Sequence, residues 1–275
     1  MFKPIKTDDK ILNSSKFNQD KITFNILISL INRKNNFPDI RVYSDDENCL
    51  LLNTDTDHPV IIWNTEDFNE YEKLYCFLNQ NFSQNNPLSL MTKQSCYQFF
   101  QNKNWLENST KTDVLAAYKC TRLNNISKTG YLDSAKPQDI ELIAQMLQKF
   151  YQEALPYEKN TFSDCLELAK SFVNYPDTHK VWKEPNGQIV AIARIENANS
   201  MARIGFVFTL PEKRGHSYAK YLVHSLVEIA LDMKLMPVLY ANFQYEPSNK
   251  CYQAVGFELI GKIYSYNIKK TDNLL

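Results

Sequence analysis

The residues FVFTLPEKRGHSYA, from Phe206 to Ala219, are the most informative part of this sequence. Their apolar start predicts a strand over 202–209, which Pro211 ends. Arg214 and Gly215 predict a tight turn, and apolar residues at helical spacing then predict a long helix to about Met233. The stretch therefore indicates a strand, a turn and a helix in direct succession.

The turn before this helix is suited to an anion. The first backbone N–H groups of a helix have no partner inside the helix, and together with the helix dipole they attract negative charge. Gly215 lets a phosphate approach the backbone closely. A plain strand–turn–helix with a glycine at the turn explains the same pattern, so this stretch alone does not decide between the two interpretations.

A second stretch follows at short range. Pro237 to Ala241 predicts a strand, and EPSNKCYQAVGF, from Glu246 to Phe257, predicts a helix that ends at a glycine. The two stretches together resemble the GNAT superfamily of N-acetyltransferases, and the similarity is best from Gly205 to Phe257. The second motif of that superfamily, S/A-N-x-x-Y-x-x-x-G-F, is matched at every fixed position: Ser248, Asn249, Tyr252, Gly256 and Phe257.

The first motif of the superfamily, Q/R-x-x-G-x-G/A, is matched with two departures. Glu212 stands where Gln or Arg is usual, and Ser217 stands where Gly or Ala is usual. Ser217 is still small, so the close backbone approach is kept. Glu212 adds a negative charge near the expected phosphates, which Lys213 and Arg214 are expected to offset. The departures bear on the affinity for coenzyme A and not on the fold.

The resemblance implies acetyl-CoA as the acyl donor substrate and no metal. The coenzyme is expected in the opening between the strands over 202–209 and 237–241, with its pyrophosphate on the amides of Arg214 to Ala219. The implied binding residues are Phe206, Val207, Phe208, Thr209, Glu212, Lys213, Arg214, Gly215, His216, Ser217, Tyr218, Ala219, Asn242, Asn249 and Tyr252. Asn249 is expected either to contact the pantetheine or to cap its own helix.

The resemblance also implies a reaction, in which an amine attacks the thioester carbonyl directly. The backbone amide of Val207 or Phe208 is expected to polarise that carbonyl. Tyr252 is expected to protonate the departing thiolate, because a phenol with a pKa of about 10 keeps its proton at neutral pH. The alternative for Tyr252 is an ordinary core aromatic.

Glu196 is the candidate general base, with a solvated carboxylate at a strand end as the alternative. A water chain is the other route that the resemblance implies for the amine proton. His216 and His224 are eight residues apart on the long helix, in a polar row with Lys220, and are interpreted as a solvated face and not as a metal site. His216 lies in the loop and is expected near a phosphate, whereas His224 is expected at the surface.

The whole second half reads as an α/β fold of the GNAT type, with a mixed central sheet flanked by helices. A polar stretch over 123–130 predicts a linker. The predicted domains are a smaller N-terminal α/β domain over 1–125 and an N-acetyltransferase domain over 126–275. The first half lacks both motifs, but its order of strands and helices looks like a degenerate half of the same superfamily. The layout is similar to two-domain acetyltransferases and to the glycine N-acyltransferase branch.

Composition restricts the partners. Lysine plus arginine and aspartate plus glutamate each number 31, so the formal net charge is zero, which disfavours a nucleic-acid partner. No membrane partner is expected. The protein is expected to be cytoplasmic and to be a monomer or a homodimer. The expected acceptor is a small-molecule primary amine more than a protein. Two alternatives stay open: an acyl-CoA:amino acid N-acyltransferase of the glycine N-acyltransferase type, and a non-catalytic acyl-CoA-binding module.

Overall fold

The computed structural model describes residues 1–33, 39–82, 84–85, 87–107, 112–155, 158 and 160–269. The chain forms two compact units, here called unit 1 (Met1–Ala117 with Ile260–Leu275) and unit 2 (Tyr118–Leu259). This division differs from the predicted domains at both ends. Residues 118–125 belong to unit 2, and residues 260–275, which were assigned to the second domain, belong to unit 1.

Unit 2 contains the two informative stretches of the sequence. Its elements are β7 (Tyr131–Asp133), η2 (Pro137–Asp139), α5 (Ile140–Ala154), α6 (Phe162–Asn174), β8 (His179–Lys183), β9 (Ile189–Ala198), β10 (Met201–Thr209), η3 (Pro211–Lys213), α7 (Tyr218–Asp232), β11 (Met236–Asn242) and α8 (Glu246–Val255). The strands run in the order β7-β8-β9-β10-β11. Neighbouring strands of this sheet are antiparallel, except that β10 and β11 are parallel. Parallel strands need a long crossover connection, which α7 provides here.

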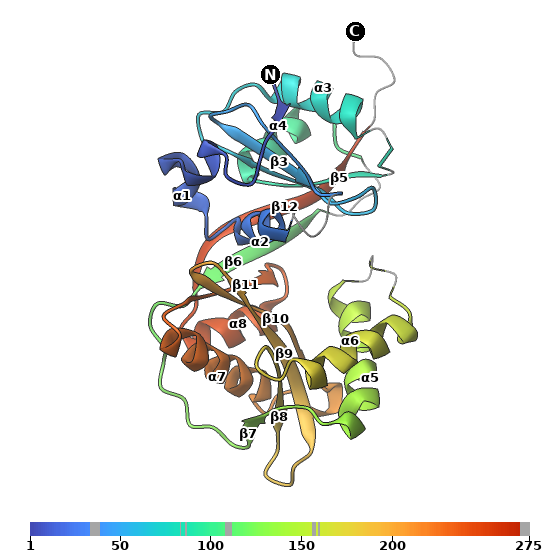
Figure 1. Ribbon diagram of the computed structural model, residues 1–275, viewed down its shortest axis with the longest axis vertical. Coiled ribbons are helices and arrows are strands. Elements are labelled where there is room, and N and C mark those ends of the chain that lie inside the picture. The colour runs from blue at the N-terminus through green and yellow to red at the C-terminus, as the bar shows by residue number, and fades with distance from the viewer. Residues whose placement is uncertain are drawn as a thin grey trace. The chain divides into compact units, whose positions relative to one another are not determined.

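Helices cover both faces of the sheet in unit 2. Figure 1 shows α7 and α8 on one side of the strands and α5 and α6 on the other. Helix α6 begins with a capping box, in which Thr161 and Asp164 satisfy each other's backbone N–H groups. The core on the α5–α6 side is built from Ile143 and Leu147 of α5, Phe172 of α6 and the inward residues of β9 and β10.

Unit 1 has the same order of elements. They are β1 (Lys3–Pro4), η1 (Lys10–Asn13), α1 (Ser15–Asp20), α2 (Asn25–Arg33), β2 (Arg41–Ser44), β3 (Cys49–Asn53), β4 (Val60–Asn64), α3 (Tyr71–Asn81), β5 (Leu88–Thr92), α4 (Gln94–Asn102) and β6 (Asp113–Lys119), with β12 (Glu258–Ile268) from the end of the chain. Strands β2, β3 and β4 pair antiparallel with one another, and β4 pairs parallel with β5. In unit 2, β8, β9 and β10 likewise pair antiparallel, and β10 pairs parallel with β11. The fold therefore repeats the pattern β-α-α-β-β-β-α-β-α-β.

The last strand of each repeat lies next to strands of the other repeat in the sheet order, β12 beside β5 and β6 beside β11. Strand β12 is antiparallel to β5 in unit 1, with Tyr264 opposite Thr92. The chain after β6 joins unit 2, where the Cys120 N–H donates to the Pro237 carbonyl of β11 over 3.0 Å. This exchange is why unit 1 contains both ends of the chain.

Most of the predicted elements are present, with shifted ends. The long helix, predicted to run to about Met233, begins at Tyr218 and ends at Asp232. Strand β5 was not predicted, and β7 directly follows the polar stretch over 123–130.

Candidate functional site

Strand β10 changes its pairing on both sides at the same place. Against β9, Gly205 lies opposite Arg194 but Phe208 lies opposite Ile192, so β10 contains one extra residue. Phe206 accommodates this bulge with a φ of 53°, in the left-handed region. Against β11, the registered pairs end at Ile204 and Leu239, although both strands continue. The two parallel strands therefore separate where the bulge begins, as the sequence analysis expected.

The loop after β10 leads directly into α7. Pro211 to Lys213 form a single 3₁₀ turn, and Gly215 follows with a φ of 83°. Ser217 occupies the N-cap position of α7 in the left-handed region, with a φ of 66°, and its side chain does not cap the helix. The first turn of α7 thus presents backbone N–H groups and the positive end of the helix dipole beside a glycine.

This loop has room for a phosphate group. A Cβ atom built on Gly215 meets no heavy atom within 4 Å, so the backbone there faces open space. At the start of the loop, the Thr209 hydroxyl is buried and has no hydrogen-bond partner. A buried hydroxyl without a partner at one end of the loop and a helix start without a side-chain cap at the other both favour a polar ligand such as a phosphate.

Glu184 holds the loop in place, and sequence reasoning missed it. It lies in the β8–β9 hairpin and accepts hydrogen bonds from Lys213 Nζ and the Tyr218 hydroxyl, each over 2.7 Å. The bonds from Lys213 and Tyr218 hold the pKa of the Glu184 carboxyl below its ordinary value. No local pattern in the sequence around Glu184 indicated this role.

Arg214 is held by α5. Its guanidinium donates to both carboxylate oxygens of Glu153, over 3.0 and 2.8 Å, and its Nε donates to the Thr209 carbonyl over 3.2 Å. Lys213 and Arg214 were expected to offset Glu212, but they pair with Glu184 and Glu153. Glu212 itself is exposed, so solvent screens its charge.

The remaining residues of the predicted site lie in the loop, in α7 and in the strands β10 and β11. His216 is exposed, its Nδ1 lies 3.0 Å from the Arg214 carbonyl oxygen, and its ring stacks on Tyr218. Ala219 lies in the first turn of α7. Val207 follows the bulge residue in β10, and Asn242 is the last residue of β11, where its side chain accepts a bond from the Gln244 N–H.

Tyr252 lies on α8 and is buried. Burial raises the pKa of its phenol well above the ordinary tyrosine value, and a hydrogen bond with Ser248 opposes that rise. Its ring makes edge contacts with Tyr118 and Phe257. The phenol is therefore protonated at neutral pH, as an acid that donates a proton must be.

Asn249, one turn before Tyr252, is a structural clamp in this conformation. Its amide nitrogen lies within hydrogen-bonding distance of the carbonyls of Asn242, Phe243 and Tyr245, at 3.0, 3.1 and 2.9 Å. Its Oδ1 accepts a bond from the Tyr118 hydroxyl. The side chain thus fixes the segment between β11 and α8 and does not cap the start of its own helix. Its contact with the pantetheine stays a prediction.

Glu196 is not a solvated carboxylate. Its two oxygens pair with the guanidinium groups of Arg194 and Arg203, each at 2.5 Å, and all three side chains are mostly buried. An amine proton would have to compete with both cations for the same oxygens. The predicted role of Glu196 as a base therefore gains no support from its surroundings.

His224 corrects the interpretation of the polar row on α7. It was expected at the surface, but it is buried and its Nε2 lies 2.9 Å from the Asn124 carbonyl oxygen. The reason is the segment after β6, which lies over this side of α7 and also places Lys128 Nζ 2.9 Å from Ser225. The stretch over 123–130 thus covers the helix.

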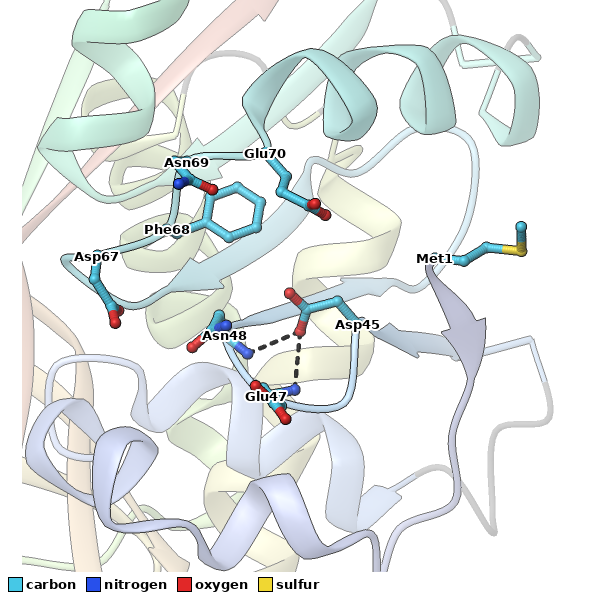
Figure 2. Close-up of a pocket in the computed structure, with 8 residues that line it drawn as sticks. All are labelled: Met1, Asp45, Glu47, Asn48, Asp67, Phe68, Asn69 and Glu70. Atoms are coloured by element: carbon cyan, nitrogen blue, oxygen red, sulfur yellow. Dashed lines mark hydrogen bonds between the residues drawn. The ribbon is translucent and has the colours of Figure 1, made fainter.

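Unit 1 contains a pocket of a different character. The pocket has a volume of about 240 Å³. Figure 2 shows its acid-rich lining, which comprises Met1, Asp45, Glu47, Asn48, Asp67, Phe68, Asn69 and Glu70. It includes no residue of the sequence-predicted site. Asp45 already accepts bonds from the backbone N–H groups of Glu47, Asn48 and Cys49.

The described part of the chain lacks two kinds of feature. None of its helices is long and apolar enough to cross a membrane. Across the same residues, no group of three or more histidine, cysteine, aspartate or glutamate side chains is arranged to hold a metal ion.

Comparisons with known proteins agree with this geometry. Residues 143–257 match the model of the acetyltransferase (GNAT) family. A GNAT-family acetyltransferase from Colwellia psychrerythraea is 14% identical, with a TM-score of 0.60 over 98% of this chain and 100% of that one. A GCN5-related N-acetyltransferase from Sphaerobacter thermophilus is 9% identical, with a TM-score of 0.64 over 100% and 97%. No curated protein sequence matches.

A third solved structure bears on the repeat. A tandem GNAT protein from the clavulanic acid biosynthesis pathway is 10% identical, with a TM-score of 0.56 over 99% of both chains. At these identities the likeness concerns the fold alone, and it extends over both repeats. The mixed α/β architecture is therefore that of GNAT structures, and the chain carries a domain of the acetyltransferase (GNAT) family at residues 143–257.

Proposed function

We propose that this protein transfers an acetyl group from acetyl-CoA to a primary amine, by direct attack within a ternary complex. The observation that carries the proposal is the separation of β10 from β11 at the Phe206 bulge, followed directly by the loop at Gly215 and the uncapped start of α7. Separated strands offer backbone groups to an extended pantetheine, and the loop offers amides to a pyrophosphate.

The reaction forms one bond and breaks one. The amine nitrogen attacks the acetyl carbonyl carbon, a C–N bond forms, and the C–S bond breaks with its electron pair on sulfur. The backbone amide of Val207 or Phe208, directly after the bulge, is the proposed donor to the carbonyl oxygen. Tyr252 is the proposed donor of the proton that the thiolate takes up.

Burial raises the pKa of Tyr252, so the phenol keeps its proton until a thiolate is formed beside it in the proposed reaction. Desolvation disfavours every anion, so a buried thiolate is a stronger base than one in water. The phenol then loses its proton only to an anion that shares its environment. Because Glu196 is held by two guanidiniums, the proposal assigns the amine proton to water and not to that carboxylate.

The proposed acceptor is a small molecule. A cytoplasmic location and a monomeric or homodimeric state remain predictions from the sequence.

The test is an assay of thiol release from acetyl-CoA by the full chain with a panel of primary amines, in which mass spectrometry identifies the product. Amine-dependent thiol release with an N-acetylated product supports the proposal. Binding of acetyl-CoA with no amine-dependent release would instead identify a non-catalytic acyl-CoA-binding module.

A further inference from the structure

The lysine and the arginine of the loop before α7, residues 211–217, are both bound by carboxylates from other elements. Lys213 pairs with Glu184 of the β8–β9 hairpin over 2.7 Å, and Arg214 pairs with Glu153 of α5 over 2.8 Å. Carboxylate and phosphate oxygens accept bonds from the same N–H groups. A phosphate of the donor must therefore displace a carboxylate before it can use either cation.

Glu184 is the carboxylate that is harder to displace. Its side chain is only 14% exposed, and it accepts bonds from both Lys213 Nζ and the Tyr218 hydroxyl. Tyr218 begins α7, so these bonds connect the hairpin to the loop and to the helix at once. Breaking them would leave two donors without this acceptor, which is costly in a site with little water.

Glu153 is easier to displace. Its side chain is 46% exposed, so water solvates the carboxylate as soon as it is released. Its two oxygens accept from one nitrogen of the Arg214 guanidinium, over 3.0 and 2.8 Å. An exposed ion pair of this kind contributes little free energy, because water screens the charges and both side chains lose conformational freedom. Of the two carboxylates, Glu153 is the one that a phosphate can replace at low cost.

Arg214 has two contacts that do not depend on Glu153. Its Nε donates to the Thr209 carbonyl over 3.2 Å, and its guanidinium carbon lies 5.3 Å from the centre of the Phe208 ring. These contacts hold the guanidinium at the end of β10 when the carboxylate leaves. The next residue in the chain is Gly215, whose backbone faces open space. A phosphate bound at Gly215 would therefore be a neighbour of the Arg214 side chain.

We propose that Glu153 is an autoinhibitory partner of Arg214, which a phosphate of the donor displaces when acetyl-CoA binds. In the free protein Glu153 occupies the guanidinium. In the complex the guanidinium donates to a phosphate oxygen, Glu153 turns to water, and the pair of Glu184 with Lys213 stays. Glu153 thus lowers the affinity for the donor without contacting it. This inference rests on the proposed function for the identity of the donor.

The test is a double-mutant cycle, measured by calorimetric titration of acetyl-CoA and of free coenzyme A into the full chain. Glu153→Gln keeps the size of the side chain and removes its charge, so it should strengthen binding about 2- to 5-fold, as the free energy of an exposed ion pair allows. Arg214→Gln should weaken binding. In the Arg214→Gln background, Glu153→Gln should have no further effect. A general effect of one lost negative charge would instead persist without the arginine.

Two further variants make the test specific. Glu141→Gln is the matched control, because Glu141 is exposed and lies in the first turn of the same helix. It is about 18 Å from Glu153 along α5, beyond the Debye length of about 8 Å, and its loss should leave the affinity unchanged. Glu184→Gln should weaken binding, because the loop loses the carboxylate that organises it.

Unchanged affinity in Glu153→Gln, or an equal gain with and without Arg214, overturns the inference. A gain in Glu184→Gln that exceeds the gain in Glu153→Gln overturns it too, because Glu184 would then be the displaced carboxylate. If wild type and all variants fail to bind either ligand, the proposed function falls and the inference falls with it. A gain in Glu153→Gln that depends on Arg214, in a protein that transfers no acetyl group, supports the competition and overturns the proposed transfer alone.

Discussion

The Tyr118 hydroxyl donates a hydrogen bond to Asn249 Oδ1 over 2.8 Å, and both side chains are buried. Tyr118 belongs to β6, the strand with which the first repeat ends, whereas Asn249 belongs to α8 of the second repeat. The exchanged strand therefore supports the helix that carries Tyr252. This contact lies within unit 2, which also contains the candidate site.

Asn249→Ala should destabilise the protein by about 2 kcal/mol, because three loop carbonyls lose their common donor and Tyr118 loses its acceptor. Urea unfolding measures the change. Lys250→Ala on the same helix removes only an exposed pair with Glu246 and should stay within about 0.5 kcal/mol. A variant of Asn249 that keeps its stability but loses affinity for acetyl-CoA would show that Asn249 binds the pantetheine.

Tyr252→Phe should lower kcat by about 100-fold and leave the affinity for acetyl-CoA unchanged, because the ring still packs and only the proton donor is lost. Since burial raises the pKa of Tyr252, the kcat of the wild type should not fall as the pH rises to about 10. Steady-state kinetics and a pH profile test this. Tyr245→Phe, at an exposed neighbour, is the control. Equal kcat values for Tyr252→Phe and wild type would exclude the acid role.

Two glycines with positive φ should respond differently to alanine. At Gly256 a Cβ would lie 2.2 Å from the Arg122 carbonyl oxygen, so Gly256→Ala should cost about 3 kcal/mol or more of stability. At Gly215 the space is open, so Gly215→Ala should cost only the backbone strain, about 1 kcal/mol, and should weaken acetyl-CoA binding. Equal losses of stability would contradict the assignment of Gly215 to a ligand loop.

Much of this site was readable from the sequence, because its signals are local. The glycine of the loop, the apolar stripe of α7 and the Y-x-x-x-G-F spacing each concern a few consecutive residues, and the strand separation followed from the resemblance. The roles of Glu184, Glu153 and Asn249 were not readable. Each depends on a partner tens of residues away, which a local pattern does not identify.

The repeat was harder to read for a physical reason. In unit 1 the segment between β4 and α3, residues 65–70, has no glycine and contains Glu66, Asp67 and Glu70, so the feature that identifies the second repeat is missing from the first. His224 was misjudged because helical periodicity describes one helix and not the segment after β6 that covers it.

The stability of the protein should fall as the pH drops from about 6.5 towards 4. Burial, with a contribution from Arg194, lowers the pKa of His179 to about 4, so the unfolded chain binds a proton in this range that the folded chain does not. The stabilisation is complete above the ordinary histidine pKa and amounts to about 2 to 3 kcal/mol. Urea unfolding of wild type and His179→Gln at several pH values isolates it. His216→Gln, at an exposed ring, should behave like wild type, and an identical pH dependence in His179→Gln would refute the assignment.

The central claim is that one loop, from Arg214 to Ala219, binds the donor, and a calorimetric titration of acetyl-CoA into the full chain tests it most directly, with free coenzyme A and a longer acyl-CoA as comparisons. We predict micromolar binding, about −8 kcal/mol, at one site per chain, because the acidic segment over 65–70 repels phosphates in the first repeat. Gly215→Ala should weaken that binding. Two sites per chain, binding that Gly215→Ala leaves unchanged, or no binding of any of the three ligands would contradict the claim.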